Sequence, residues 1–249
     1  MIEISLKAEE LFHLGSFPVT NSLLLTGIVF LCLAFMGWQF RSKLSEVPGN
    51  LQNVLELILE GVLSLMDSVL GSRHRSELYL PFIATIFLVV VLSNWMGLLP
   101  GVGSIGLKEF HEGRESFVPI FRAPSADLNF TLALAIVVVL SVNILGAIQV
   151  GTKKYLGKFF TLKNPIYTFV GLLEFVSELA KMVSFSFRLF GNVFAGEVLL
   201  IIIGALVPYF IPLPFLALEI FVGFIQGFIF AMLALVFLAI STSEEAHEH

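Results

Sequence analysis

A nearly unbroken apolar segment, spanning about residues 165–207, is the feature that most restricts how this chain can fold. At 1.5 Å per residue, its roughly 43 residues would form a helix about 65 Å long, which is twice the hydrocarbon thickness of a bilayer. Such a helix cannot stand upright in a membrane and must be steeply tilted or broken. Because hydrophobic mismatch alone gives only ordinary tilts, we expect a packing partner to hold it.

Four further segments are long and apolar enough to cross a bilayer as helices. They span about residues 19–40, 79–99, 128–150 and 212–241. Apolar residues make up 57% of the chain and charged residues only 13%, which lies outside the usual composition of a soluble domain. The sequence therefore predicts an all-α polytopic membrane protein with five membrane helices.

The segment 50–70 has a different pattern. Its apolar residues recur every three or four positions, while Glu56, Glu60 and Asp67 occupy the other face. This pattern is typical of an amphipathic helix that lies at the membrane surface or against a partner. The whole chain, 1–249, is expected to form one membrane domain. Its parts are an outer N-terminal segment (1–18), the helices of 19–150 around the amphipathic segment, and a long helical hairpin (165–241).

The short loops predict the orientation of the chain, because cytoplasmic loops of membrane proteins carry an excess of Lys and Arg. If the five spans alternate, the N-terminus lies outside and the acidic tail inside. The cytoplasmic side then has the larger group of cations: Arg41, Lys43, Arg73, Arg75, Lys153, Lys154, Lys158 and Lys163. The opposite side has Lys7, Lys108, Arg114 and Arg122.

A polar stripe runs along the long helix. At about 100° per residue, six of its polar residues share one face. They are Glu174, Ser177, Lys181, Ser184, Arg188 and Asn192. Glu197, nine residues after Arg188, points to the opposite side. The helix thus offers polar groups on one side toward the cytoplasm and on the other side toward the outside, with Arg188 near the changeover. This layout is typical of two half-passages that do not meet.

The last helix carries polar residues that complement this stripe. Glu219 and Gln226 are seven residues apart and share a face, and the turn at 208–212 folds the helix back along the previous one. In this antiparallel hairpin, Gln226 faces Arg188 and Glu219 faces Glu197 in nearly the same register. We expect Gln226 to hydrogen-bond the guanidinium and the two carboxylates to share a hydrated outer cavity.

Structural roles are the alternatives for several of these residues. Ser177, Ser184 and Asn192 could bond neighbouring helices, and Lys181 could extend to the cytoplasmic interface. Glu174 and Glu178 are expected at a hydrated cytoplasmic mouth rather than at a buried proton site. A salt bridge with Glu197 is the structural alternative for Arg188, and the opposite-face geometry counts against it.

Four motifs carry a family resemblance: "SNWMGLLP", "APSADLNFTL", "LLEFVSELAKMVSFSFRLFGNVFAGE" and "FVGFIQGFIFAML". Through them the chain resembles the subunit a family of F-type ATP synthases over most of its length. The resemblance implies that the long helix lies nearly flat against a rotating ring of c subunits. Arg188 matches the family's essential arginine, and Gln226 matches the glutamine of the last helix. Asn192 and Glu197 match the residues that follow the arginine, and Glu219 falls where members carry histidine or an acid.

The resemblance extends the predicted proton pathway to the outer passage and its loop, where Asn94, Asp127 and Asn129 correspond to polar positions. With Glu174 and Ser184 on the cytoplasmic side, these residues complete the predicted set. The family often has a proline after the lysine, whereas Met182 follows Lys181 here. The implied partners are the c-ring, the peripheral stalk b subunits, other ATP synthase subunits and the lipid bilayer, with no nucleic acid.

The implied function is to provide two offset proton half-channels and the arginine that couples proton flow to ring rotation during ATP synthesis. The chain carries no nucleotide-binding motif, so synthesis is expected on other subunits, and we expect neither a cofactor nor a metal. The expected location is a bacterial plasma (inner) membrane, with a thylakoid or other coupling membrane as the alternative. A self-contained cation channel and a passive scaffold of a membrane complex are the alternative functions.

Overall fold

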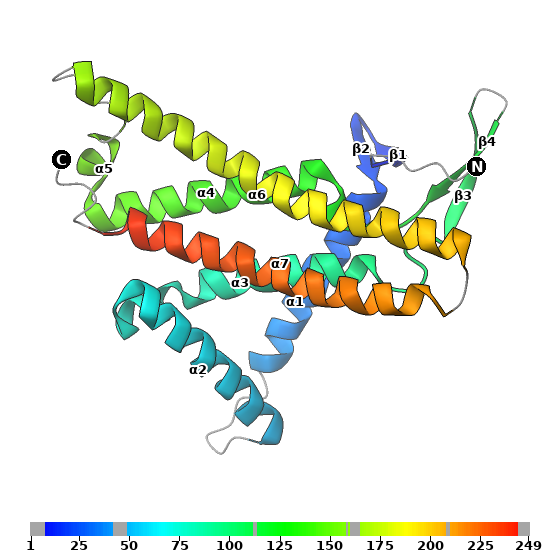
Figure 1. The fold of residues 1–249 in the computed structure, drawn as a ribbon, viewed down its shortest axis with the longest axis horizontal. Coiled ribbons are helices and arrows are strands. Elements are labelled where there is room, and N and C mark those ends of the chain that lie inside the picture. Colours follow the sequence, from blue (N-terminus) through cyan, green and yellow to red (C-terminus); the bar gives the residue numbers. More distant parts are fainter. Residues whose placement is uncertain are drawn as a thin grey trace. The chain divides into compact units, whose positions relative to one another are not determined.

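The computed structural model describes residues 8–41, 49–111, 114–157, 159, 165–207 and 210–243, and these are mostly helical (Figure 1). The predicted helices are confirmed as α1 (Asn21–Arg41), α2 (Asn50–Leu70), α3 (Arg73–Gly97), α4 (Leu128–Val150), α6 (Pro165–Leu206) and α7 (Pro212–Ser241). The sequence did not predict the short helix α5 (Thr152–Gly157) or the 3-10 turn η1 (Pro124–Ala126). Lys7, Lys43, Lys158, Lys163, the first two residues of the 208–212 turn and the tail beyond 243 lie outside the described residues.

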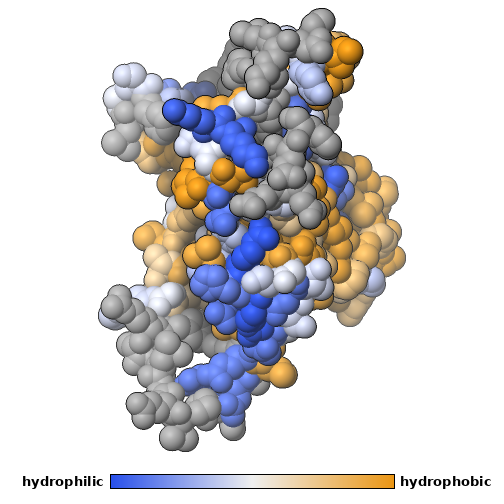
Figure 2. Space-filling view, turned by 90° about the vertical axis from the view of Figure 1, so that its left-hand side faces the viewer, coloured by the Kyte–Doolittle hydropathy of each residue, from blue (hydrophilic) through white to orange (hydrophobic). Residues whose placement is uncertain are grey.

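Five of the helices, α1, α3, α4, α6 and α7, are long and apolar enough to cross a membrane, as predicted. The helix α6 is continuous over 42 residues. Only 11% of its membrane-span window is buried inside the chain, against 44% for the window in α3. Large hydrophobic side chains are exposed on all five, and the face drawn in Figure 2 shows hydrophobic surface on either side of hydrophilic residues. The apolar surface needs a bilayer or a partner to cover it.

Two short antiparallel hairpins depart from the all-α prediction. One joins β1 (Glu10–Leu14) to β2 (Phe17–Thr20), and the other joins β3 (Gly106–His111) to β4 (Arg114–Pro119). Gly15 turns the first with φ of +67°, a conformation that favours glycine. Strands of four to six residues are too short for a clear periodic pattern, so the sequence carries little sign of them.

The chain divides into two compact units, each built from three separate stretches. Unit 1 comprises 1–35, 88–133 and 185–228, and unit 2 comprises 36–87, 134–184 and 229–249. Each of α1, α3, α4, α6 and α7 contributes one part to unit 1 and the other part to unit 2. The single membrane domain over 1–249 stays a prediction.

In unit 1, the end of α3 is fixed to the start of α7 by side chains that donate to the α7 backbone. Asn94 Nδ2 donates to the Gly223 carbonyl at 3.0 Å, and Trp95 Nε1 donates to the Ile220 carbonyl at 3.0 Å. Val90 and Leu189 are fully buried in the same unit. The two hydrogen bonds join α3 to α7, and both helices line the candidate site together with α6.

In unit 2, α2 buries one side of its amphipathic pattern through Leu63, Met66 and Leu70. Gly71 ends α2 in a left-handed conformation, with its N–H donating to the Asp67 carbonyl. Arg73 at the start of α3 then pairs with Glu60 at 2.6 Å, with Asp67 at 3.2 Å and with Glu77 at 3.1 Å. The predicted polar face of α2 is therefore tied to the beginning of the next membrane helix.

Candidate functional site

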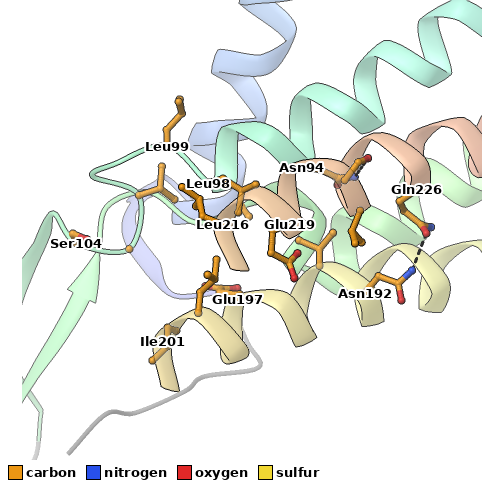
Figure 3. Close-up of a pocket in the computed structure, with 18 residues that line it drawn as sticks. Asn94, Leu98, Leu99, Ser104, Asn192, Glu197, Ile201, Leu216, Glu219 and Gln226 are labelled. Atoms are coloured by element: carbon orange, nitrogen blue, oxygen red, sulfur yellow. Dashed lines mark hydrogen bonds between the residues drawn. The ribbon is translucent and has the colours of Figure 1, made fainter. Parts of the chain in front are cut away.

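A cavity of about 260 Å³ lies in unit 1 between the ends of three membrane helices (Figure 3). Its walls come from the end of α3, the loop that follows α3, Ala123, the second half of α6 and the first half of α7. Most lining residues are apolar, and the polar ones are Asn94, Ser104, Asn192, Glu197, Glu219 and Gln226. A mostly apolar cavity with a few convergent polar groups is the usual form of a functional site.

Two carboxylates, Glu197 of α6 and Glu219 of α7, line this cavity together. Gly196 makes their approach possible, because a Cβ at that position would overlap the Glu219 carboxylate. The missing side chain lets Glu219 lie directly against α6, one residue before Glu197, as Figure 3 shows. The antiparallel register read from the sequence predicted this pairing of helices.

Three buried polar atoms that face the cavity have no hydrogen-bond partner within the described part of the chain. They are Asn94 Oδ1, Glu197 Oε2 and Gln226 Nε2. Buried polar atoms are nearly always bonded to protein or to ordered water, and this cavity is large enough to admit water. The site is therefore suited to hold water in contact with an acidic side chain, which is the chemistry of proton exchange.

Gln226 has a different partner from the one that the sequence predicted. Its side chain is only 2% exposed, and its Oε1 accepts a hydrogen bond from Asn192 Nδ2 at 2.8 Å. The predicted hydrogen bond to the Arg188 guanidinium is not made among the described residues. The reason lies in the packing of α6, which buries Phe185, Ser186 and Leu189 and leaves the intervening Arg188 exposed.

Arg188 is exposed and does not line the cavity. Ser184 and Gly191, one turn before and after it, are exposed on the same side of α6. Arg188 makes no ion pair or hydrogen bond with any residue that the structure describes. Charged side chains within membrane spans pair with one another or face a pathway, and Arg188 has no such pair among the described residues.

The family model described as ATP synthase A chain matches residues 21–239 of the chain. The ATP synthase subunit a of Campylobacter concisus (strain 13826) is 35% identical over 249 residues, covering all of both chains. That of Campylobacter fetus subsp. fetus (strain 82-40) is 35% identical over 247 residues, covering 98% of this chain and 100% of the relative. The chain belongs to the ATP synthase subunit a family. The resemblance seen in the four motifs is thereby confirmed.

Membership of the subunit a family gives the chain a place and a set of partners. It is a multi-span membrane protein with five candidate spans, and its bacterial relatives indicate the plasma membrane. A chain of this family is one subunit of an ATP synthase, so other ATP synthase subunits are its partners.

Four residues that were predicted to belong to the proton pathway do not line the cavity. Asp127 instead caps α4, accepting hydrogen bonds from the Ser22 hydroxyl and, at 2.9 Å, from the Asn129 backbone N–H. Asn129 is exposed. Glu174 is half-buried and Ser184 is exposed, and both lie on the part of α6 that belongs to unit 2. The cavity of unit 1 thus collects Asn94, Asn192, Glu197, Glu219 and Gln226 alone from the predicted set.

Arg122 is a residue of the site region that sequence reasoning missed. It is only 6% exposed, in the turn before η1, and its positive charge acts electrostatically on Glu197. From the sequence, Arg122 is expected only among the cations of the outer loops. The available signal was its place directly before "APSAD", a motif that packs against the end of α3 through Ala123 and Gly97.

Proposed function

We propose that this chain is the proton-translocating stator subunit of an ATP synthase. In this function it leads protons through two offset half-channels to and from a rotating ring of c subunits, with Arg188 separating the two. One observation carries the proposal: two carboxylates and three unpartnered buried polar atoms share a single cavity in unit 1. Family membership supports a role within an ATP synthase.

The cavity is the outer half-channel in this proposal. Water in the cavity delivers protons to Glu197 and Glu219, which both line it, with the Glu219 carboxylate lying against α6 at Gly196. Asn94 and Gln226 each present an unpartnered polar atom that orients this water. The hydrogen bond between Asn192 and Gln226 joins α6 to α7 at the end of the cavity.

Arg188 acts on the ring and not on the cavity. A bare carboxylate in lipid is prohibitively costly, so a ring site can lose its proton only where a cation compensates it. Arginine stays charged under all physiological conditions, whereas a buried lysine can lose its proton. The exposed position of Arg188 on α6 suits contact with a carboxylate of another subunit.

The inner half-channel begins on the side of α6 that carries Ser184 and Glu174, toward the cation-rich cytoplasmic loops. A ring carboxylate takes up a proton from the outer cavity, crosses lipid in the neutral form, and releases the proton to this inner side after nearly a full rotation. The membrane potential supplies about 2.3 kcal/mol per charge per 100 mV. Nucleotide chemistry takes place on other subunits.

The substitution Arg188→Ala tests this proposal in the complete ATP synthase. We expect ATP-driven acidification of inverted membrane vesicles to be abolished while the subunit content of the complex, measured on a gel, stays normal. Without the Arg188 cation, a ring carboxyl group can no longer lose its proton as it passes α6. Passive proton leak should rise, because protonated ring sites can then pass directly from one half-channel to the other.

The substitution Glu197→Gln is the comparison within the same experiment. It removes one proton-exchanging group from the outer cavity but leaves Arg188 in place, so pumping should slow and the passive leak should stay low. If a fully assembled complex with Arg188→Ala pumped normally, the proposal would be wrong and a passive scaffold would remain. Ion conduction by the purified chain alone would instead favour a self-contained channel.

A further inference from the structure

A second polar cluster lies in unit 2 and is built from residues that have no role in the proposal above. Glu178 of α6 is at its centre, with a side chain only 12% exposed. Its Oε1 accepts a hydrogen bond from Lys181 Nζ at 2.8 Å, and its Oε2 accepts one from Asn143 Nδ2 at 3.0 Å. Both carboxylate oxygens therefore have a hydrogen-bond partner within the chain.

The surrounding residues hold Asn143 in the orientation that this contact requires. The Tyr155 hydroxyl of α5, 3% exposed as a residue, donates to Asn143 Oδ1 at 2.6 Å. The same hydroxyl lies 3.0 Å from Ser241 Oγ of α7. Asn143 Nδ2 also donates to the Val139 carbonyl at 2.8 Å. Side chains from α4, α5 and α7 thus hold the Glu178 carboxylate in place, and this carboxylate accepts the hydrogen bond from Lys181.

Lys181 is held from a second direction by an aromatic ring. Its ammonium lies 4.8 Å from the centroid of the Phe237 ring of α7, within the range of a cation–π contact. Its side chain is 24% exposed, so it does not extend freely to the interface as the sequence allowed. The cation is compensated by Glu178 on one side and by the Phe237 face on the other.

This arrangement matters because α6 carries only two cations. Every residue of α6 is described, and Lys181 and Arg188 are the only Lys or Arg between Pro165 and Leu206. They are seven residues apart, which is about two turns or 10 Å on nearly the same face of the helix. A ring carboxylate drawn to Arg188 would also be drawn to an uncompensated Lys181, which would hold it away from the point of proton transfer.

We propose that Glu178, positioned by Asn143, neutralises Lys181 so that Arg188 is the single uncompensated cation on α6. This inference rests on the proposed function, because it matters only if ring carboxylates move past α6. In that case they must not meet an uncompensated charge on Lys181. Glu178 acts through Lys181 and is a positioning residue with no contact to the reacting groups. The partner addressed is an anionic side chain on another subunit, arriving from the exposed face of α6.

The test compares Glu178→Gln with the double variant Glu178→Gln/Lys181→Gln in the complete complex. The single variant leaves Lys181 uncompensated, and we expect ATP-driven pumping to slow about tenfold, as expected for a unit charge acting over roughly 10 Å at a partly screened site. The double variant removes both charges and should restore pumping to within about twofold of the parent. A merely structural role would give the opposite order, since the double variant loses more contacts.

A milder variant covers the case in which Glu178→Gln fails to assemble. Asn143→Ala keeps both charges but releases Glu178 Oε2, so pumping should fall by a smaller factor and should recover when Lys181→Gln is added. Glu60→Gln is the matched control, because it breaks the exposed ion pair with Arg73, 2.6 Å long, and should leave pumping unchanged.

Several outcomes would overturn the inference. Normal pumping by Glu178→Gln would show that Lys181 needs no compensation. Equal loss in the single and double variants, or failure of both to assemble, would show that the pair is only structural. None of these outcomes touches the proposed function, which Arg188→Ala tests separately in the same vesicles.

Discussion

The substitution Gly196→Ala isolates the geometry of the outer cavity without changing any charge. A methyl group at this position would overlap the Glu219 carboxylate, which lies against the α6 backbone. Glu219 must therefore leave its place against α6, while both carboxyl groups remain in the protein. We expect proton uptake through the cavity to slow because the two carboxylates lose the arrangement that lets them share protons.

Two opposing effects set the size of the change in stability. Alanine is favoured over glycine inside a helix by about 1 kcal/mol, whereas overpacking typically costs about 1–3 kcal/mol. The group that must yield is the end of the flexible Glu219 side chain, so the cost falls at the lower end of that range. The two effects nearly cancel, so the free energy of unfolding should change by less than about 1 kcal/mol. The rate should fall by about tenfold or more, as misplacement of a proton-transfer group by about 1 Å does elsewhere.

The assay is ATP-driven acidification of inverted vesicles, with subunit content checked on a gel and thermal stability measured on the purified complex. Gly204→Ala is the matched control, because it makes the same change on the same helix where a Cβ would meet nothing within 4 Å. It should leave pumping unchanged. Adding Glu219→Asp to Gly196→Ala shortens the displaced side chain and should restore part of the rate.

Normal pumping by Gly196→Ala in a fully assembled complex would refute the reasoning, since it would show that the position of Glu219 against α6 is unimportant. A rate that Glu219→Asp fails to improve would indicate that the alanine disturbs α6 and not the cavity.

Two further predictions concern residues that hold the cavity walls. Asn94→Ala removes the 3.0 Å hydrogen bond to the Gly223 carbonyl, so thermal unfolding of the complex should show a loss of about 1 kcal/mol together with slower pumping. Asp127→Ala removes the cap of α4 and should cost about 1 kcal/mol of stability, whereas Asp127→Asn, which retains an accepting oxygen, should lose little. Asp127 does not line the cavity, so Asp127→Ala should lower the amount of assembled complex while pumping per complex stays near normal. A selective loss of pumping would instead show that Asp127 belongs to the proton pathway.

The hydrophobic pattern of the sequence was sufficient to place the helices. Segment lengths and apolar content predicted α1, α3, α4, α6 and α7 to within a few residues, except that α3 begins six residues earlier, at Arg73. This works because a bilayer admits only helices or closed barrels, so length and polarity decide the element. The family followed from linear motifs, which are likewise a property of the sequence alone. The hairpins β1–β2 and β3–β4 were missed because local signals for short strands are weak.

Only the tertiary structure decided which polar side chains meet. Helical spacing assigned each residue to a face, but it could not show that Gln226 pairs with Asn192, or that Asp127 caps a helix. The role of Asn143 was also invisible, because its partner lies more than 30 positions away, and the only signal for Arg122 was its place before "APSAD". Periodicity fixes the direction of a side chain about its own helix axis, whereas its partner depends on the rotation and offset of a neighbouring helix. Those are set by packing contacts such as Glu219 against Gly196, which no single segment encodes.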